Sequence, residues 1–173
     1  MNILVAGIGN IFLGDDGFGS AVAQRLCSVR LPEGVRVRDF GIRGLELGYA
    51  LNDGVDVAIL VDTAQRGGPP GSVYLIEPEA ATCVTEEMAQ TFSPHGMEPQ
   101  AMLRWASQLG EACQRVVLVA CEPESFGEDT PEQGRIGLSR PVEAAIPAAV
   151  ELIKELVTEM HTEGAEHAIC STA

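Results

Sequence analysis

Hydrophobic residues along the chain follow two alternating patterns: short continuous runs, and longer segments in which apolar residues recur every three or four positions. The short runs are rich in β-branched residues, which is typical of strands. The first, third and fifth runs are apolar throughout, as expected for strands that are covered on both faces of a largely parallel sheet. The second run, "VRVRDF", alternates valine with polar residues and predicts an edge strand. The five predicted strands span residues 3–8, 35–40, 55–62, 73–76 and 116–121.

Helical spacing appears between these runs and after the last of them. The first stripe comprises Phe18, Val22, Leu26 and Val29, and the second comprises Met102, Ala106 and Leu109. The last stripe lies in a helix that is expected to start near Ser139. It comprises Val142, Ile146, Ala149, Ile153 and Leu156. Strands that alternate with helices predict a single three-layer α/β domain, in which helices cover both faces of a twisted, five-stranded sheet.

One connection departs from this alternation. Residues 63–71, "TAQRGGPPG", are too few for the crossover that a parallel neighbour needs, so the fourth strand is expected to run antiparallel in an otherwise parallel sheet. Two long connections, residues 78–99 and 123–137, have the length of functional loops. The domain is expected to cover residues 1–160, followed by a flexible C-terminal tail over residues 161–173.

Composition narrows the class of protein. The chain has 173 residues, which is the length of one domain, and its five cysteines contain no CxxC pair, as expected for reduced thiols. A net charge of −14 argues against a nucleic-acid partner. The opening "MNILVAG" lacks the basic region and the apolar length of a signal peptide or membrane anchor. We therefore expect a cytoplasmic protein, and a monomer.

The stretch "GIGNIFLGDDGFG", residues 7–19, begins like a dinucleotide-binding turn and then differs from one. Gly7 and Gly9 follow the apolar residues 3–6 of the first strand, but Phe12 stands where the third glycine belongs. Asp15 and Asp16 then place negative charge where a pyrophosphate needs positive charge. A dinucleotide-binding oxidoreductase stays a weak alternative, because Asp39 lies where a ribose-binding acid would be.

Three residues of metal-binding types lie at or after the ends of predicted strands: Asp16, Asp62 and His95. Ligands collect outside the carboxyl ends of the strands in open α/β sheets. His95 joins the two aspartates only if the loop after the fourth strand returns across the sheet. Two carboxylates and one imidazole suit Zn²⁺, Ni²⁺ or Mn²⁺ and leave positions open for water or a substrate group.

Each of these residues also has a structural explanation. Asp15 or Asp16 can cap the following helix and complement its dipole. Asp62 can turn the chain after its strand, and His95 can be a solvated loop residue.

The segment "DFGIRGLEL", residues 39–47, follows the edge strand at the same end of the predicted sheet. Gly41 and Gly44 bracket Arg43, and glycines at such positions permit unusual backbone angles or the close approach of a partner chain. The alternative is an ordinary loop that caps the next helix through Gly44.

Together these motifs resemble the maturation endopeptidases of [NiFe]-hydrogenases. The resemblance extends to about residue 157 and is carried by the order and spacing of six pieces. They are "GIGNIFLGDDGFG", "DFGIRGLEL", "LVDTA" around Asp62, "SPHG" around His95, "PES" at 123–125 and "GLS" at 137–139. The fold that this resemblance implies, a twisted five-stranded mixed sheet between helices, agrees with the pattern of hydrophobic residues.

The resemblance also implies roles for residues. Asp16, Asp62 and His95 match the family's metal-contacting positions, and we expect them to be the catalytic residues of a metal-dependent endopeptidase. Residues 39–46 match the glycine-containing loop that the family uses to sense nickel, so Asp39, Gly41, Arg43 and Gly44 are expected to recognise the substrate.

The implied substrate is the precursor of a [NiFe]-hydrogenase large subunit, cut once near its C-terminus after nickel insertion. The nickel is then supplied by the precursor and serves as the recognition element. Two departures from the family pattern can alter which precursor is accepted: Arg43 replaces a small residue, and "FGEDTPEQGR" lengthens the connection before "IGLS".

Two questions stay open at the level of sequence. Nickel can polarise the scissile carbonyl or activate a water, with an aspartate as general base, or it can act only as a docking signal. A noncatalytic module that binds the precursor and checks its metal would use the same residues as an endopeptidase.

Overall fold

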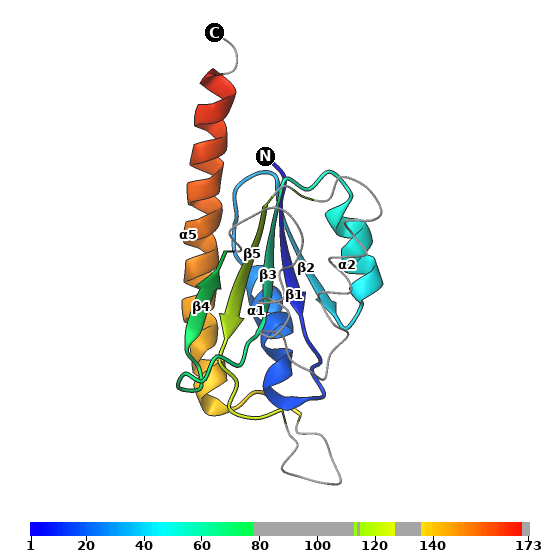
Figure 1. The fold of residues 1–173 in the computed structure, drawn as a ribbon, viewed down its shortest axis with the longest axis vertical. Helices are drawn as coiled ribbons and strands as arrows, with labels where there is room; N and C mark the ends of the chain where they lie inside the picture. The colour runs from blue at the N-terminus through cyan, green and yellow to red at the C-terminus, as the bar shows by residue number, and fades with distance from the viewer. Residues whose placement is uncertain (78–112, 114, 127–135, 171–173) are drawn as a thin grey trace.

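The computed structural model describes residues 1–77, 113, 115–126 and 136–170, with side chains described as far as residue 162. Its strands form one five-stranded sheet in the order β2-β1-β3-β5-β4 (Figure 1). The five predicted strands are confirmed, and their ends shift by at most two residues. The bounds are β1 Ile3–Ile8, β2 Val35–Gly41, β3 Val57–Thr63, β4 Val73–Ile76 and β5 Arg115–Cys121.

The sheet is mostly parallel. β1 pairs in parallel with β2 and β3, and β3 pairs in parallel with β5. β4 is antiparallel, as the short connection before it predicts, but it pairs with β5 rather than with β3. β5 therefore lies between two strands that follow one another closely along the chain, and the turn that joins β3 to β4 passes over the end of β5.

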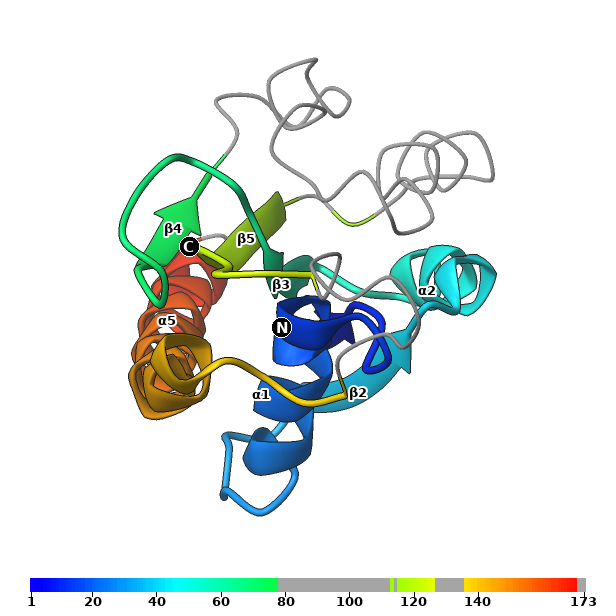
Figure 2. The same ribbon diagram turned by 90° about the horizontal axis from the view of Figure 1, so that it is seen from below.

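The helices form a layer on each face of the sheet, which confirms the three-layer α/β prediction. α1 (Phe18–Leu26) and α5 (Arg140–Cys170) share one face, and α2 (Gly44–Leu51) covers the other (Figure 2). Alternate residues of a strand enter the two cores: Val61 packs with the α1 and α5 side, and Leu60 with the α2 side. Burial on both faces is why β1 and most of β3 and β5 are apolar at successive positions, whereas the edge strand β2 alternates.

Helix α5 is longer than the apolar spacing predicts. It continues through Pro147 and extends to Cys170, beyond the end of the sheet (Figure 1). Most of the segment expected to be a tail is thus helical, and its first residue is in contact with the domain: His161 Nε2 lies 2.7 Å from the carbonyl oxygen of Glu33. The predicted stripe of Met102, Ala106 and Leu109 lies outside the described residues.

Within the described part of the chain, no helix combines the length and apolar character needed to cross a membrane.

Candidate active site

Glycines bring helix α1 directly onto the sheet at the carboxyl end of β1. A Cβ on Gly19 would lie 2.1 Å from the carbonyl oxygen of Val61 and 2.2 Å from that of Ile8. A Cβ on Gly7 would lie 2.4 Å from the carbonyl oxygen of Gly19. No other residue fits either position, so Gly19 provides the close helix–strand packing that Phe12 cannot. The sequence comparison with a dinucleotide fingerprint, which considered only position 12, missed this role.

The turn after β1 folds back on itself and places Asp16 over the strand end. Gly9 has a φ of 127°, and a Cβ there would lie 1.8 Å from the carbonyl oxygen of Asp16. The carboxylate of Asp16 accepts a hydrogen bond from the Asn10 N–H at 2.7 Å, and its side chain is almost fully buried. Asp16 belongs to the short helical turn η1 (Gly14–Gly17), which this arrangement holds against Gly9.

Asp62 lies beside the same glycine. A Cβ on Gly9 would be 3.8 Å from Asp62 Oδ1, and Asp62 is 4% exposed near the end of β3. Burial, together with the negative charge of Asp16, raises the pKa of Asp62 to about 8. The sequence-based prediction that Asp16 and Asp62 converge is therefore confirmed by their proximity, although their roles are a separate question.

Within the described residues, Asp62 has few hydrogen-bond donors around it. Among the described residues, one hydrogen bond to its carboxylate is found, from the Thr63 N–H at 2.7 Å. A carboxylate has about four acceptor sites, so this side chain retains the capacity to bind a cation or a water molecule. His95, the expected third ligand, lies outside the described residues. In the parts of the chain that the structure describes, no group of three or more metal-ligating side chains is found.

Asp15 has a different role from its neighbour. Its side chain is completely buried and accepts hydrogen bonds from Glu124 N at 2.8 Å, Ser125 N at 3.0 Å and Ser139 N at 2.6 Å. Three charge-assisted bonds thus tie η1 to the chain after β5 and to the residue before α5. The motifs "PES" and "GLS" both contain residues that donate to Asp15, a role that pattern alone does not reveal.

The capping explanation for the two aspartates is wrong. The N-cap of α1 is Gly17, and no side chain hydrogen-bonds to the end of the helix there. Both aspartates instead lie in the preceding turn η1, where one faces the site and the other anchors distant loops.

A further buried carboxylate, Glu122, was missed by the sequence analysis. It follows β5 directly, is 5% exposed, and accepts hydrogen bonds from Arg66 N at 2.9 Å, Gly67 N at 3.1 Å and the Tyr74 hydroxyl at 2.9 Å. Burial alone raises the pKa of Glu122, but these donors outweigh it and hold the pKa below its ordinary value. The only signal in the sequence is an acid directly after an apolar strand, which is too common to be diagnostic.

The expected recognition loop is joined to the site through its backbone. The Gly9 N–H donates to the carbonyl oxygen of Gly41 at 3.1 Å, and Gly41 has a φ of 54°, which favours glycine. The Asp39 carboxylate accepts bonds from Gly41 N at 3.0 Å and from Ser20 Oγ at 2.8 Å. Asp39 therefore fixes the loop against α1, and the unusual backbone angle expected of these glycines is found at Gly41.

Arg43 and Gly44 occupy the start of α2. The Arg43 guanidinium donates to the carbonyl oxygen of Asp39 and forms an exposed ion pair with Glu46 at 3.6 Å. Gly44 is the first helical residue, and the N-cap is Arg43, without a side-chain capping bond. Gly44 therefore does not cap this helix. Recognition of a substrate by these four residues is not tested by their internal contacts.

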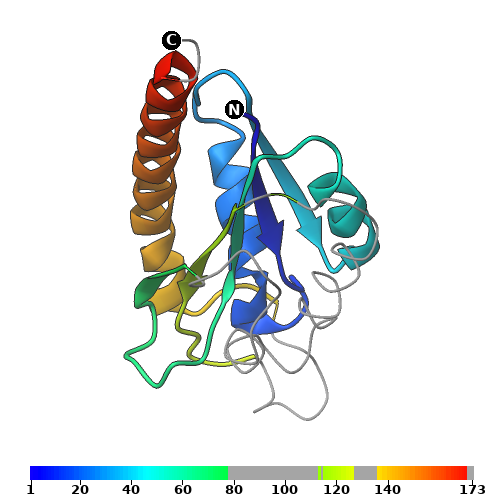
Figure 3. The same ribbon diagram turned by 45° about the horizontal axis from the view of Figure 1, so that its top comes forward.

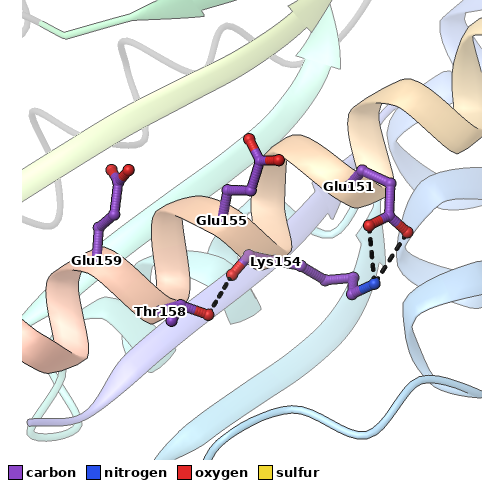
Figure 4. Close-up of a pocket in the computed structure, with 5 residues that line it drawn as sticks. All are labelled: Glu151, Lys154, Glu155, Thr158 and Glu159. Atoms are coloured by element: carbon purple, nitrogen blue, oxygen red, sulfur yellow. Dashed lines mark hydrogen bonds and ion pairs between the residues drawn. The ribbon is translucent and has the colours of Figure 1, made fainter.

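A shallow pocket on the outer surface of α5 is separate from this site. Figure 4 shows its lining residues, all from one helix: Glu151, Lys154, Glu155, Thr158 and Glu159. The Lys154 ammonium binds Glu151 Oε2 at 2.8 Å. Long side chains on one exposed helix face account for the pocket, and neither Asp16 nor Asp62 lines it.

Comparison with known proteins decides the family. A sequence model of the hydrogenase maturation protease family matches residues 21–156, which is most of the chain. The chain belongs to the hydrogenase maturation protease family. It is a hydrolase by this membership, which favours a protease over the dinucleotide-binding alternative. The opening motif up to Gly19 lies outside the matched residues.

Curated relatives agree with this assignment. The hydrogenase expression/formation protein HupD of Rhizobium leguminosarum bv. viciae is 33% identical over 153 residues, which cover 86% of this chain and 70% of the relative. The hydrogenase 2 maturation protease of Escherichia coli K12 is 30% identical over 166 residues, which cover 94% of each chain.

Solved structures of such proteases share the fold. The hydrogenase maturating endopeptidase HybD from E. coli matches with a TM-score of 0.76 at 29% identity, covering 92% of this chain and 94% of that one. A hydrogenase 2 maturation peptidase from a Thaumarchaeota archaeon matches with a TM-score of 0.67 at 32% identity, covering 91% and 99%. The single α/β domain of this protease is therefore the fold of its family.

Proposed function

We propose that this protease removes the C-terminal extension of a [NiFe]-hydrogenase large-subunit precursor after nickel insertion, and that the precursor's nickel is the element it recognises. The observation that carries the proposal is the buried pair Asp16 and Asp62, whose mutual repulsion contributes to the raised pKa of Asp62. A cation between two such carboxylates offsets both the repulsion and the cost of burial.

The pair makes binding conditional on metal. Without a cation, Asp62 holds a proton at neutral pH, because its pKa is raised to about 8. Metal binding requires the ionised carboxylate and therefore releases this proton. A precursor that lacks nickel leaves Asp62 protonated and gives the pair no ion to bind, so nothing at this site aligns its scissile bond.

The expected third ligand is His95, and together the three residues form a mixed oxygen and nitrogen set suited to Ni²⁺. Three protein ligands leave positions open for groups that arrive with the precursor. The nickel can then polarise the scissile carbonyl, with an aspartate of the pair accepting the proton of the attacking water.

The recognition loop supports the same proposal. Asp39 and Gly41 hold the end of β2 next to Gly9, where an added Cβ would meet both aspartates of the pair. A precursor that places nickel at Asp16 and Asp62 would therefore lie against residues 39–44. Arg43 and Gly44 are then in position to contribute to the choice of precursor.

The deciding experiment is the mass of a nickel-loaded large-subunit precursor after incubation with the protease. We expect the loss of one C-terminal peptide with the wild type, and no loss with Asp16→Asn, Asp62→Asn or His95→Ala. Asp53→Asn is the matched control, because Asp53 is an exposed acid that is 78% accessible and pairs with Arg36.

Each failure has a distinct meaning. Cleavage of nickel-free precursor at the same rate would contradict recognition through nickel. Binding without any change of mass would replace the endopeptidase by a noncatalytic metal-checking module. Unimpaired cleavage by Asp16→Asn and Asp62→Asn would show that the pair is not the site.

A further inference from the structure

The turn between β3 and β4, residues 64–72, begins two residues after Asp62 and is hydrogen-bonded to the end of β5. Figure 3 shows it connecting the lower end of β3 to β4. The Ala64 N–H donates to the carbonyl oxygen of Cys121 at 3.0 Å, and the Gly71 N–H to that of Glu122 at 2.8 Å. The Glu122 carboxylate accepts hydrogen bonds from the backbone N–H groups of Arg66 and Gly67. The turn is therefore held at both ends and in the middle.

Tyr74 completes this anchoring from β4. Its hydroxyl donates to Glu122 Oε2 at 2.9 Å, and a Cβ on Gly68 would lie 2.1 Å from that hydroxyl oxygen. The turn thus packs against the phenol ring without space for a larger residue. A backbone with so many fixed points presents its side chains in a defined position.

The side chain that the turn presents is Arg66. Its guanidinium carbon stands 5.7 Å from the centroid of the Tyr74 ring, which is within the range of a cation–π contact. Arg36, Arg38 and Arg43 form ion pairs with Asp53 or Glu46. Within the described residues, no carboxylate forms an ion pair with Arg66, which is exposed. This guanidinium therefore lies over an aromatic ring on an exposed residue, within reach of a ligand that arrives from solvent.

The position of Arg66 relative to the acidic pair gives it a chemical purpose. Asp62 lies opposite Ala120 in the sheet, and Glu122 follows two residues later, so the Asp62 and Glu122 side chains lie on the same face. The chain carries a net charge of −14, so a peptide that brings a carboxylate to this end of the sheet is repelled. Tyr74 is also opposite Ala120, so the Arg66 guanidinium stands at the same end of the sheet as the pair, over the neighbouring edge strand β4. A guanidinium there offsets part of that repulsion and binds carboxylates in a bidentate manner.

We propose that Arg66, held by Glu122 and Tyr74, is a specificity-determining residue that binds a carboxylate of the precursor's C-terminal extension. The inference rests on the proposed function, in which cleavage at the Asp16 and Asp62 pair brings the extension to this end of the sheet. The carboxylate belongs either to an acidic side chain of the extension or to its C-terminus.

The test compares Arg66→Ala and Arg66→Lys with the wild type in two measurements, steady-state cleavage of nickel-loaded precursor and equilibrium binding of the same precursor. We expect Arg66→Ala to raise KM and Kd by about tenfold, with kcat within about twofold, because an ion pair used in binding acts before chemistry. The KM and Kd of Arg66→Lys should lie between those of the wild type and Arg66→Ala, because lysine keeps the charge but lacks the planar guanidinium that binds a carboxylate through two hydrogen bonds. Added salt should weaken binding of the wild type more than that of Arg66→Ala.

Arg30→Ala is the matched control. Arg30 is also an exposed arginine, but it lies in the connection between α1 and β2, at the opposite end of the sheet. We expect its KM and Kd to equal those of the wild type. Melting temperatures of all variants check that the fold is intact.

Two altered precursors distinguish the sources of the carboxylate. Replacing the acidic residues of the extension by their amides should abolish the difference between wild type and Arg66→Ala if a side chain is bound. Adding a neutral glycine–serine tail should abolish it if the C-terminus is bound. A difference that survives both changes would overturn the proposal.

The inference and the proposed function fail in different ways. If the wild type cuts the precursor and Arg66→Ala has the same KM and Kd, the inference is wrong and the proposed function stands. If the wild type binds without cutting, the proposed function fails, and the Kd values still decide the role of Arg66. If the wild type does not bind the precursor, both are wrong.

Discussion

The buried carboxylates of this protease fall into two groups that differ in their hydrogen-bond donors. Asp15 and Glu122 each accept hydrogen bonds from three donors in distant parts of the chain, most of them backbone N–H groups. Asp62 receives one such bond among the described residues, from the next residue, and has the negative charge of Asp16 nearby. The first group holds loops together, whereas the second retains the capacity to bind a cation.

Their pKa values reflect the same difference. Donors hold the pKa of Glu122 below its ordinary value despite its burial. Burial and the charge of Asp16 raise the pKa of Asp62 to about 8. Similar depth in the protein therefore produces opposite shifts, because hydrogen bonds to the ionised form decide the sign.

The largest effect on stability is expected from Asp15→Ala. This change leaves the N–H groups of Glu124, Ser125 and Ser139 without their acceptor, at a cost of about 3 kcal/mol or more in the free energy of unfolding. Urea denaturation measures it, and Asp53→Ala, at an exposed acid, should stay within about 0.5 kcal/mol of the wild type. A loss below about 1 kcal/mol would mean that Asp15 is not an anchor.

Asp62→Asn should have the opposite effect on the metal-free protein and stabilise it. Unfolded Asp62 ionises near 3.8, but folded Asp62 keeps its proton up to about pH 8. The native state of the wild type therefore loses stability as pH rises from about 4 to 8, and the asparagine variant lacks this loss. We expect the free energy of unfolding of Asp62→Asn to exceed that of the wild type by roughly 2–3 kcal/mol at pH 8 and by almost nothing at pH 4. Each pKa unit between 3.8 and about 8 contributes at most about 1.4 kcal/mol, so this gain lies below the limit that the whole difference sets.

Denaturation at several pH values in the presence of a chelator measures this gain. Asp53→Asn provides the control and should show no pH-dependent difference from the wild type. Equal stability of Asp62→Asn and wild type at pH 8 would argue against a destabilised carboxylate.

Glu122→Gln should destabilise the protein by about 1–2 kcal/mol at pH 7, since an amide presents an N–H group to donors that need an acceptor. The sign of the pH dependence is reversed relative to Asp62. A lowered pKa stabilises the fold above the unfolded value of 4.5, and this stabilisation disappears as pH falls through the folded pKa. The difference from wild type should therefore shrink on acidification, and a difference that grows would contradict the anchoring role.

The smallest effect is expected from a divalent cation added without precursor. Ni²⁺ or Zn²⁺ at the Asp16 and Asp62 pair should raise the melting temperature by about 2–4 °C, equivalent to about 1 kcal/mol. The increase should be larger at pH 8 than at pH 6, because Asp62 must lose its proton. Asp16→Asn and Asp62→Asn should abolish this increase in melting temperature, and Glu122→Gln should retain it. Loss of the increase in Glu122→Gln would contradict the distinction between carboxylates that hold loops together and carboxylates that can bind a cation.

Much of the candidate site follows from local pattern. Asp16 and Asp62 follow or close apolar strands, and the carboxyl ends of parallel strands meet at one edge of the sheet, so their convergence is predictable without coordinates. The placement of His95 depends on the path of a long loop and lies outside the described residues, so it stays a prediction. The roles of Asp15 and Glu122 were not predictable, because their donors lie up to 124 positions away in the sequence.

The sequence by itself determined the strands, their mostly parallel arrangement and the acidic end of the sheet, because burial on two faces and short connections act locally along the chain. The tertiary structure alone decided that β5 lies between β3 and β4, and that Gly19 seats α1 on the sheet. It also decided which of two adjacent aspartates anchors loops and which faces Asp62. These outcomes depend on groups that meet only after the chain has folded, and residue type does not specify the donors that a carboxylate will find there.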